Sequence, residues 1–185
     1  AYLEVTLNPA NDLKFERILN VPKRGLGDTS LRRINELARA RGGVPLYQAA
    51  REIVETEELA GKTRKSLADL VASFERWRQA VESMRHTDLA ELILDESGYT
   101  HMWQQDKSPQ AQSRLDNLKE LVRFMHDFET LSGFLEHVSL VMDADKSNDG
   151  DRVSIMTLHA AKGLEFDTVF LTGWEEGLFP HQRAL

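Results

Sequence analysis

The chain has 185 residues, a net charge of −7, and hydrophobic and charged fractions of 41% and 29%. These values are ordinary for a globular domain, and no apolar run approaches the roughly 18 residues that a membrane-spanning helix needs. Cysteine is absent, which excludes disulfides and thiolate metal sites and is typical of a reducing compartment. No signal peptide is visible. The chain begins with Ala1, and AYLEV starts as if inside a structural element, so we expect a fragment of a longer protein.

Apolar residues spaced by three and four predict a mainly α protein with many helices. Asn11 and Asp12 are expected to cap the first helix, Gly42 and Gly43 to end the second, and Pro45 to open the third. Further caps are expected at Thr87-Asp88 and Ser132. Helices are expected over residues 12–20, 28–41, 46–53, 67–84, 89–96, 109–128 and 133–141.

The pattern changes after the polar stretch Asp143–Asp151, which is typical of a loop or linker. Residues 153–156 and 168–171 are apolar without alternation, which indicates two strands buried on both faces, as in a parallel sheet. We therefore expect a helical domain over 1–145, a polar linker over 146–152, and a piece of an α/β domain over 153–185. Two strands alone make a marginal sheet, so this last piece is expected to be incomplete.

Basic residues gather near the N-terminus of this acidic chain. Residues 14–41 hold eight basic and three acidic side chains, a net charge of +5, which leaves −12 on the remainder. A local basic patch binds phosphate even on an acidic body, because screening favours near charges. The alternative is a solvated helix face.

The stretch VPKRGLGD lies inside the basic window, between two expected helices, and matches a helix-hairpin-helix. Two glycines let the backbone approach a phosphate, and the following helix offers free N–H groups and the positive end of its dipole. The alternative is a plain interhelical turn. The candidate duplex-binding residues are Lys23, Arg24, Gly25, Leu26, Gly27, Asp28 and Thr29.

The stretch TLHAAKGLEF, residues 157–166, separates the two expected strands. Loops at the carboxyl ends of parallel strands bind ligands, so Thr157, His159 and Lys162 are candidates for phosphate contacts and Glu165 for a ribose. The alternative is an ordinary crossover. By contrast, Gly61-Lys62-Thr63 is no phosphate loop, because the glycine required five residues earlier is replaced by a threonine and no apolar strand precedes it. No pattern indicates a metal site.

Three stretches carry a resemblance to a known family. MTLHAAKGLEFDTVFLTGWEEGLFP resembles motif V and the following strand of superfamily 1 DNA helicases of the UvrD/PcrA/Rep type. FERILNVPKRGLGDTSL resembles the start of their helical 2B subdomain, and SRLDNLKELVRF echoes another part of it. The resemblance runs along essentially the whole chain and is strongest at its two ends.

The resemblance implies a fragment of an ATP-dependent 3′-to-5′ DNA helicase used in repair and replication, with two RecA-like motor domains. It assigns duplex DNA to the hairpin, single-stranded DNA to Thr157, His159 and Lys162, and the nucleotide to Gly163 and Glu165. ATP and Mg²⁺ are the implied cofactors of the full-length protein, and none is expected on the fragment.

The implied partners are DNA at a single-strand/duplex junction, the missing motor domains and repair proteins, in the bacterial cytoplasm near the nucleoid and away from membranes. A 2B subdomain could also serve partner docking or autoinhibition. A different class of function stays open, namely a free-standing helical module that binds DNA or docks a protein.

The sequence predicts that these 185 residues do not hydrolyse ATP by themselves, because the Walker A lysine, the Walker B carboxylates and the arginine fingers are missing. Phosphate release from ATP and Mg²⁺, with single-stranded DNA present, should equal the rate without protein. Release that grows with protein concentration and persists through purification would contradict the prediction.

Overall fold

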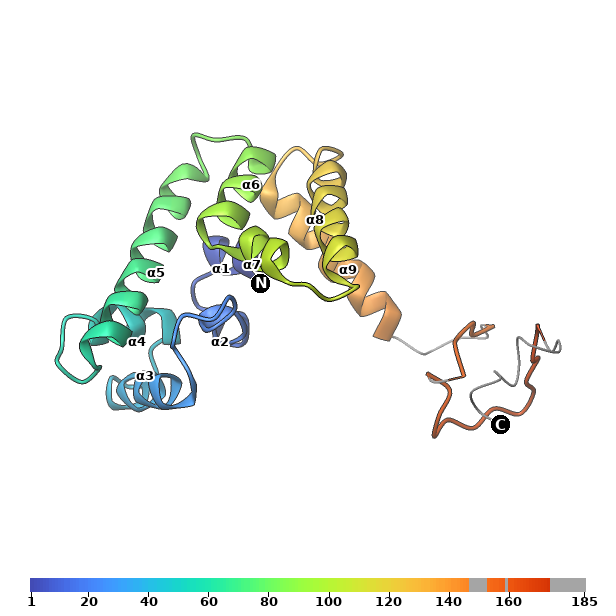
Figure 1. Cartoon of the computed structure of the whole chain (residues 1–185), viewed down its shortest axis with the longest axis horizontal. Coiled ribbons are helices and arrows are strands. Elements are labelled where there is room, and N and C mark those ends of the chain that lie inside the picture. The colour runs from blue at the N-terminus through green and yellow to red at the C-terminus, as the bar shows by residue number, and fades with distance from the viewer. Residues whose placement is uncertain (147–152, 159, 174–185) are drawn as a thin grey trace. The chain divides into compact units, whose positions relative to one another are not determined.

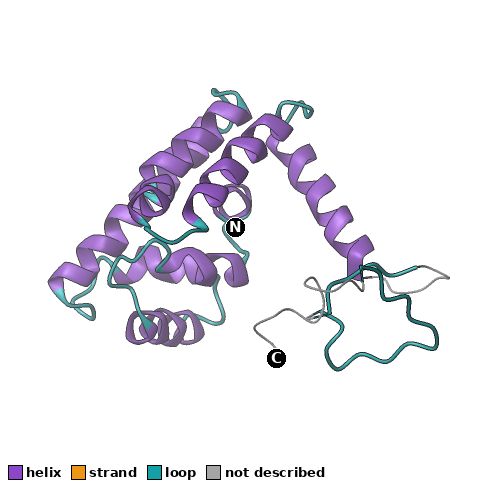
Figure 2. Ribbon diagram, turned by 45° about the vertical axis from the view of Figure 1, so that its right-hand side comes forward, coloured by secondary structure: helices purple, strands orange, loops and turns teal. Residues whose placement is uncertain are grey.

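The computed structural model describes residues 1–146, 153–158 and 160–173, and the chain divides into two compact units, residues 1–146 and 147–185. All regular structure in the described residues is helical and lies in the first unit (Figures 1 and 2). The helices are α1 (Tyr2–Leu7), α2 (Asp12–Leu19), α3 (Asp28–Ala40), α4 (Leu46–Ile53), α5 (Gly61–Ala80), α6 (His86–Glu96), α7 (Tyr99–Gln105), α8 (Ala111–Met125) and α9 (Leu131–Lys146).

Several expected helix ends are confirmed in atomic detail. The side chain of Asn11 accepts a hydrogen bond from the Lys14 backbone N–H at 3.2 Å and so caps α2. Gly42 and Gly43 end α3 with φ values of 84° and 83°, and the Gly43 N–H donates to the Ala38 carbonyl at 2.9 Å. Left-handed backbone of this kind closes helices at glycine because glycine has no Cβ to clash.

Other helix ends differ from the expectation. The helix α6 begins at His86, so Thr87 lies inside it and is buried rather than capping it. Thr130 caps α9 in place of Ser132, through a 3.1 Å bond from the Gly133 N–H to its hydroxyl oxygen. Serine and threonine compete for cap positions with similar energies, and tertiary packing selects between neighbours.

The sequence pattern did not predict the short helix α1. The helix α9 extends four residues into the stretch Asp143–Asp151, which was expected to be a loop. Six residues are too few to show helical periodicity, and an isolated helix of that length is unstable in water. Packing holds α1 in place, since it contacts α2, α5, α6 and α9.

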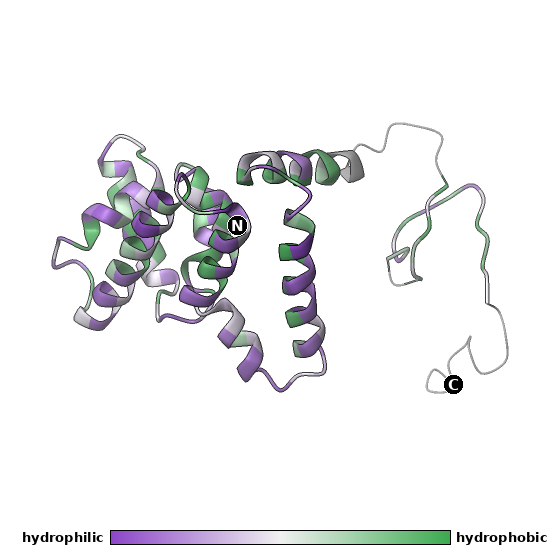
Figure 3. Ribbon diagram, turned by 90° about the horizontal axis from the view of Figure 1, so that it is seen from above, coloured by the Kyte–Doolittle hydropathy of each residue, from purple (hydrophilic) through white to green (hydrophobic). Residues whose placement is uncertain are grey.

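The core forms around α5, which packs against α1, α4 and α6. Phe74 and Trp77 of α5 are fully buried and meet edge to face, with ring centroids 4.9 Å apart. Tyr2 stacks on Phe74 at 6.0 Å, and Tyr47 of α4 meets Phe74 at 5.8 Å. Helices of this unit show an apolar stripe and a polar face, as along α8 in Figure 3.

The two expected strands are absent from the described residues, which corrects that part of the predicted fold. Residues 153–156 and 168–171 carry no strand pairing, and Val153, Ile155 and Phe170 expose 91%, 96% and 86% of their surface. A strand buried on both faces needs neighbouring strands and covering helices, and a two-stranded pair without them is marginal. The described part of this unit does not supply them.

Among the described residues, no helix combines the length and the apolar character needed to cross a bilayer. The same residues contain no cluster of His, Cys, Asp and Glu that could hold a metal ion.

The aromatic core predicts a large penalty for Phe74→Ala, because the change empties a fully buried site and removes ring contacts with Tyr2, Tyr47 and Trp77. Urea denaturation should show a loss of about 3–5 kcal/mol in the free energy of unfolding. Leu13→Ala on α2 is the matched control, since Leu13 is 78% exposed and its loss should cost under about 0.5 kcal/mol. Equal costs for the two variants would contradict this placement of the core.

Candidate nucleic-acid interface

The connection between α2 and α3, residues 20–27, forms a compact hairpin fixed by its own polar groups. The Asn20 side-chain oxygen accepts hydrogen bonds from the backbone N–H of Arg24 at 2.9 Å and of Leu26 at 3.2 Å. The Leu26 side chain is buried and anchors the hairpin in the core. Gly25 has a φ of 74°, a conformation that a side chain would strain. The backbone therefore folds back on itself within a few residues.

The outer side of the hairpin is open to solvent. Lys23, Gly25 and Gly27 are exposed, as are Asp28 and Thr29 in the first turn of α3. A Cβ added at either glycine would meet no atom within 4 Å, and no side chain caps the α3 N-terminus. Free N–H groups and the positive end of the helix dipole thus lie beside an exposed lysine, a combination that favours an anion.

Arg24 is placed differently from Lys23, although the sequence suggests the same role for both. Its guanidinium donates to the carbonyl oxygens of Ile18 at 3.1 Å, Pro22 at 3.2 Å and Ser97 at 2.8 Å. It also donates to the Tyr2 hydroxyl at 2.5 Å. The charged group is half-buried and bound to the protein's own oxygens.

Part of the basic window is neutralised by ion pairs within the fold. Lys14 pairs with Glu4 at 2.9 Å and Arg41 with Glu52 at 2.9 Å, while Arg33 donates to the Glu58 carbonyl. Within the described part of the chain, no ion pair occupies the exposed side chains of Arg17, Lys23, Arg32 and Arg39. Within this window, the exposed basic side chains without an ion pair therefore lie on the hairpin (Lys23), on α2 (Arg17) and on α3 (Arg32 and Arg39).

The motif V candidates lie in the second unit. Thr157 closes a single turn, with its hydroxyl accepting from the Ala160 N–H at 3.2 Å and its carbonyl from the Ala161 N–H at 3.0 Å. Lys162 and Glu165 are exposed, and Gly163 has a φ of 85°. His159 lies outside the described residues. The turn brings Thr157 close to the backbone of its own loop and leaves the charged side chains accessible.

The chain matches a known protein family along its whole length. The family described as the UvrD-like helicase C-terminal domain matches residues 1–185. The chain belongs to this family. The resemblance seen in its motifs is thereby confirmed over its whole length.

Individual relatives of the family extend well beyond this chain. It is 43% identical over 187 residues to a probable DNA helicase II homolog of Rickettsia felis and 41% identical over 205 residues to the ATP-dependent DNA helicase PcrA of Bacillus subtilis. It is 39% identical over 210 residues to the ATP-dependent DNA helicase UvrD1 of Mycobacterium tuberculosis. All of this chain is covered but only 26–28% of each relative, so it spans about a quarter of their length.

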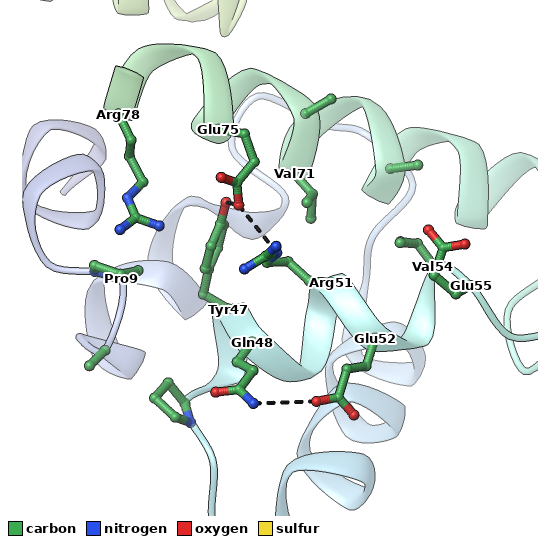
Figure 4. Close-up of a pocket in the computed structure, with 14 residues that line it drawn as sticks. Pro9, Tyr47, Gln48, Arg51, Glu52, Val54, Glu55, Val71, Glu75 and Arg78 are labelled. Atoms are coloured by element: carbon green, nitrogen blue, oxygen red, sulfur yellow. Dashed lines mark hydrogen bonds and ion pairs between the residues drawn. The ribbon is translucent and has the colours of Figure 1, made fainter. Parts of the chain in front are cut away.

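This UvrD-like chain also carries a groove of about 760 Å³ between α4 and α5 that no sequence pattern indicated (Figure 4). Tyr47, Arg51 and Glu75 point toward one another across it (Figure 4), with Glu75 accepting from the Tyr47 hydroxyl at 2.9 Å and pairing with Arg51 at 3.2 Å. Burial, reinforced by Glu75, raises the pKa of the Tyr47 hydroxyl above its ordinary value. These polar groups bind one another, and we assign them a structural role.

Sequence reasoning missed the partners that organise the hairpin, Tyr2 and Ser97. Ser97 is 73 residues away from Arg24 and Tyr2 is 22 residues away. No local motif marks either residue, because only the packing of α1 and α6 brings them to the hairpin. Asn20 was also missed, although an Asn at the end of a helix is a known acceptor for turn N–H groups.

The hairpin geometry predicts different costs for its two glycines. Gly25→Ala should lower the free energy of unfolding by about 1–2 kcal/mol, because alanine at a φ of 74° brings its Cβ against the following carbonyl. Gly27→Ala should cost less, since its φ of −81° is accessible to alanine. Thermal denaturation of both variants tests the difference, and a Gly25→Ala variant as stable as the unchanged protein would refute the hairpin conformation.

Proposed function

We propose that the chain is the part of an ATP-dependent DNA helicase that binds duplex DNA beside a single-strand junction. In this proposal residues 1–145 are a 2B-like helical subdomain, and its hairpin, residues 20–27, with the first turn of α3 forms the contact. The observation that carries the proposal is the exposed Lys23 beside open glycine backbone and an uncapped helix N-terminus. The family match and the helicase names of the relatives support it.

The proposed contact is with phosphates and not with bases. Lys23 supplies positive charge, and the open backbone at Gly25 and Gly27 admits a phosphate oxygen to hydrogen-bonding distance of the N–H groups. The Asp28 carboxylate repels a phosphate, so Asp28 and Thr29 contribute through their backbone N–H groups. Contacts of this kind position a duplex without reading its sequence.

The second unit has a separate role in the proposal. Residues 146–152 are a linker, and residues 153–185 are a segment of a RecA-like motor domain whose remaining strands are supplied by the rest of the protein. Thr157, His159 and Lys162 contact single-stranded DNA, while Gly163 and Glu165 contact the nucleotide. The exposed carboxylate of Glu165 suits hydrogen bonds from ribose hydroxyls. In the whole protein, hydrolysis of Mg²⁺-bound ATP would supply the free energy for translocation.

The proposal places the whole protein in a bacterial cytoplasm, near the nucleoid, with DNA and repair proteins as partners. The relatives that support this are bacterial helicases. In the whole protein the helical subdomain regulates unwinding through its hold on the duplex.

Lys23→Ala should weaken binding to a duplex with a single-stranded tail. Because one phosphate contact is lost, the slope of log affinity against log salt concentration should fall in magnitude by about 0.9. Fluorescence anisotropy with labelled DNA between about 50 and 200 mM salt measures both quantities.

Lys107→Ala is the matched control, since Lys107 is an exposed lysine in the connection between α7 and α8, away from the hairpin in sequence. It should leave affinity and slope unchanged. If Lys23→Ala behaves like Lys107→Ala, the hairpin is not the duplex contact.

A further inference from the structure

We propose that Arg24 is a positioning residue for duplex binding, which fixes the hairpin against α1 and the α6–α7 junction and makes no phosphate contact itself. The inference rests on the duplex-binding function proposed above. In this inference Lys23 contacts DNA, and Arg24 holds the hairpin in place.

The terminal N–H groups of Arg24 are all occupied by acceptors within the protein. The two terminal nitrogens of an arginine carry four N–H groups in a rigid plane. In Arg24, Nη1 donates to the carbonyls of Ile18 and Pro22, and Nη2 donates to the Ser97 carbonyl and the Tyr2 hydroxyl. All four are therefore occupied, and the paired N–H groups of a bidentate phosphate contact are not free. We call this set of bonds the Arg24 bridge.

The acceptors of the Arg24 bridge come from four different parts of the helical unit. Ile18 lies at the end of α2, Pro22 in the hairpin, Tyr2 at the start of α1, and Ser97 at the C-cap of α6. The α6–α7 junction also lies against the hairpin directly, since a Cβ added at Gly98 would stand 3.9 Å from the Pro22 ring. One side chain thus ties the hairpin to elements that are distant in sequence.

Tyr2 makes the bridge rigid. Its ring is buried against Phe74 and Trp77, and its hydroxyl donates to the Val21 carbonyl at 2.6 Å while accepting from Arg24. Burial raises the pKa of this hydroxyl above its ordinary value, against an opposing effect of Arg24, so the proton needed for the Val21 bond is retained at neutral pH. The hydroxyl is fixed by the core and in turn fixes the loop.

The bridge and Asn20 together restrain the hairpin on two sides. Val21 and Pro22 are held through their carbonyls, and Arg24 and Leu26 through their N–H groups bonded to Asn20. Lys23 stands between these restrained residues with its side chain exposed. A loop that is already ordered does not lose conformational entropy on binding, and affinity rises accordingly.

The test compares Arg24→Lys and Tyr2→Phe with Lys23→Ala in the 185-residue chain, using anisotropy with tailed duplex DNA across the salt range. Arg24→Lys keeps the charge but not the planar fork, and Tyr2→Phe keeps the ring and all positive charges. Each should weaken binding about threefold to tenfold, because a hydrogen bond to a charged group is lost from the ordered loop. Neither should change the salt slope, whereas Lys23→Ala lowers it.

A second readout follows the loop without DNA. Amide hydrogen exchange at Arg24 and Leu26 should accelerate in Arg24→Lys and Tyr2→Phe, while amides of α8 stay unchanged. Tyr47→Phe is the matched control, since it also removes a hydroxyl bond of a buried tyrosine but one that belongs to Glu75. It should alter neither the exchange of the loop nor the affinity for DNA.

The outcomes separate the two proposals. If Arg24→Lys and Tyr2→Phe bind DNA as well as the unchanged protein while Lys23→Ala does not, the positioning role is wrong and the duplex contact stands. If Arg24→Lys binds normally and Arg24→Ala lowers the salt slope as Lys23→Ala does, Arg24 is itself a phosphate contact. If no variant, Lys23→Ala included, alters binding, the proposed duplex contact fails and the positioning role fails with it.

Discussion

The burial of Tyr2 is the constraint that joins the core of the helical unit to its candidate interface. Its ring packs on Phe74 and Trp77 of α5, so it belongs to the aromatic cluster around which α1, α4, α5 and α6 assemble. Its hydroxyl bonds the Val21 carbonyl and the Arg24 guanidinium, so it also belongs to the hairpin. A tyrosine can do both because its apolar ring and polar hydroxyl lie at opposite ends. The geometry of the loop therefore depends on the packing of the core.

The hairpin shows how a segment without regular structure can still be well defined. Its backbone groups are paired with side chains in place of helical partners, with Asn20 accepting from two N–H groups and Arg24 donating to two carbonyls of its own neighbourhood. Such bonds satisfy polar groups that would otherwise oppose folding. What they leave open is the outer side, where glycine backbone and a lysine are exposed. An ordered loop with an open polar side suits the repeated, uniform phosphates of a duplex.

Charge counted along the sequence overstates the charge available to a ligand. The window of residues 14–41 carries +5, but Lys14 and Arg41 pair with Glu4 and Glu52 from outside the window. Pairs that stay partly open to solvent contribute little to stability, yet they reduce the local potential. The charge of Arg24 is less available to a ligand for a different reason, because its guanidinium donates hydrogen bonds to acceptors within the protein. The positive charge that the window leaves free is smaller than the sequence count indicates, and Lys23 is the part of it that lies on the hairpin.

The sequence by itself determined most of the helices, the start of α2 at its Asn11 cap, the end of α3 at Gly42-Gly43, and the family. These features are local: a cap, a left-handed glycine and a stripe of apolar residues act within a few positions of the chain. It also located the hairpin as the candidate interface.

The sequence did not predict α1, because its six residues are too few to show a helical period. It predicted strands at 153–156 and 168–171 that the structure does not show, because a β pattern needs pairing partners. Only the tertiary structure decided the different positions of Lys23 and Arg24, because the acceptors of Arg24 on Tyr2 and Ser97 come from segments up to 73 residues away. The sequence shows that both residues are positively charged, but only packing decides which groups surround each charge.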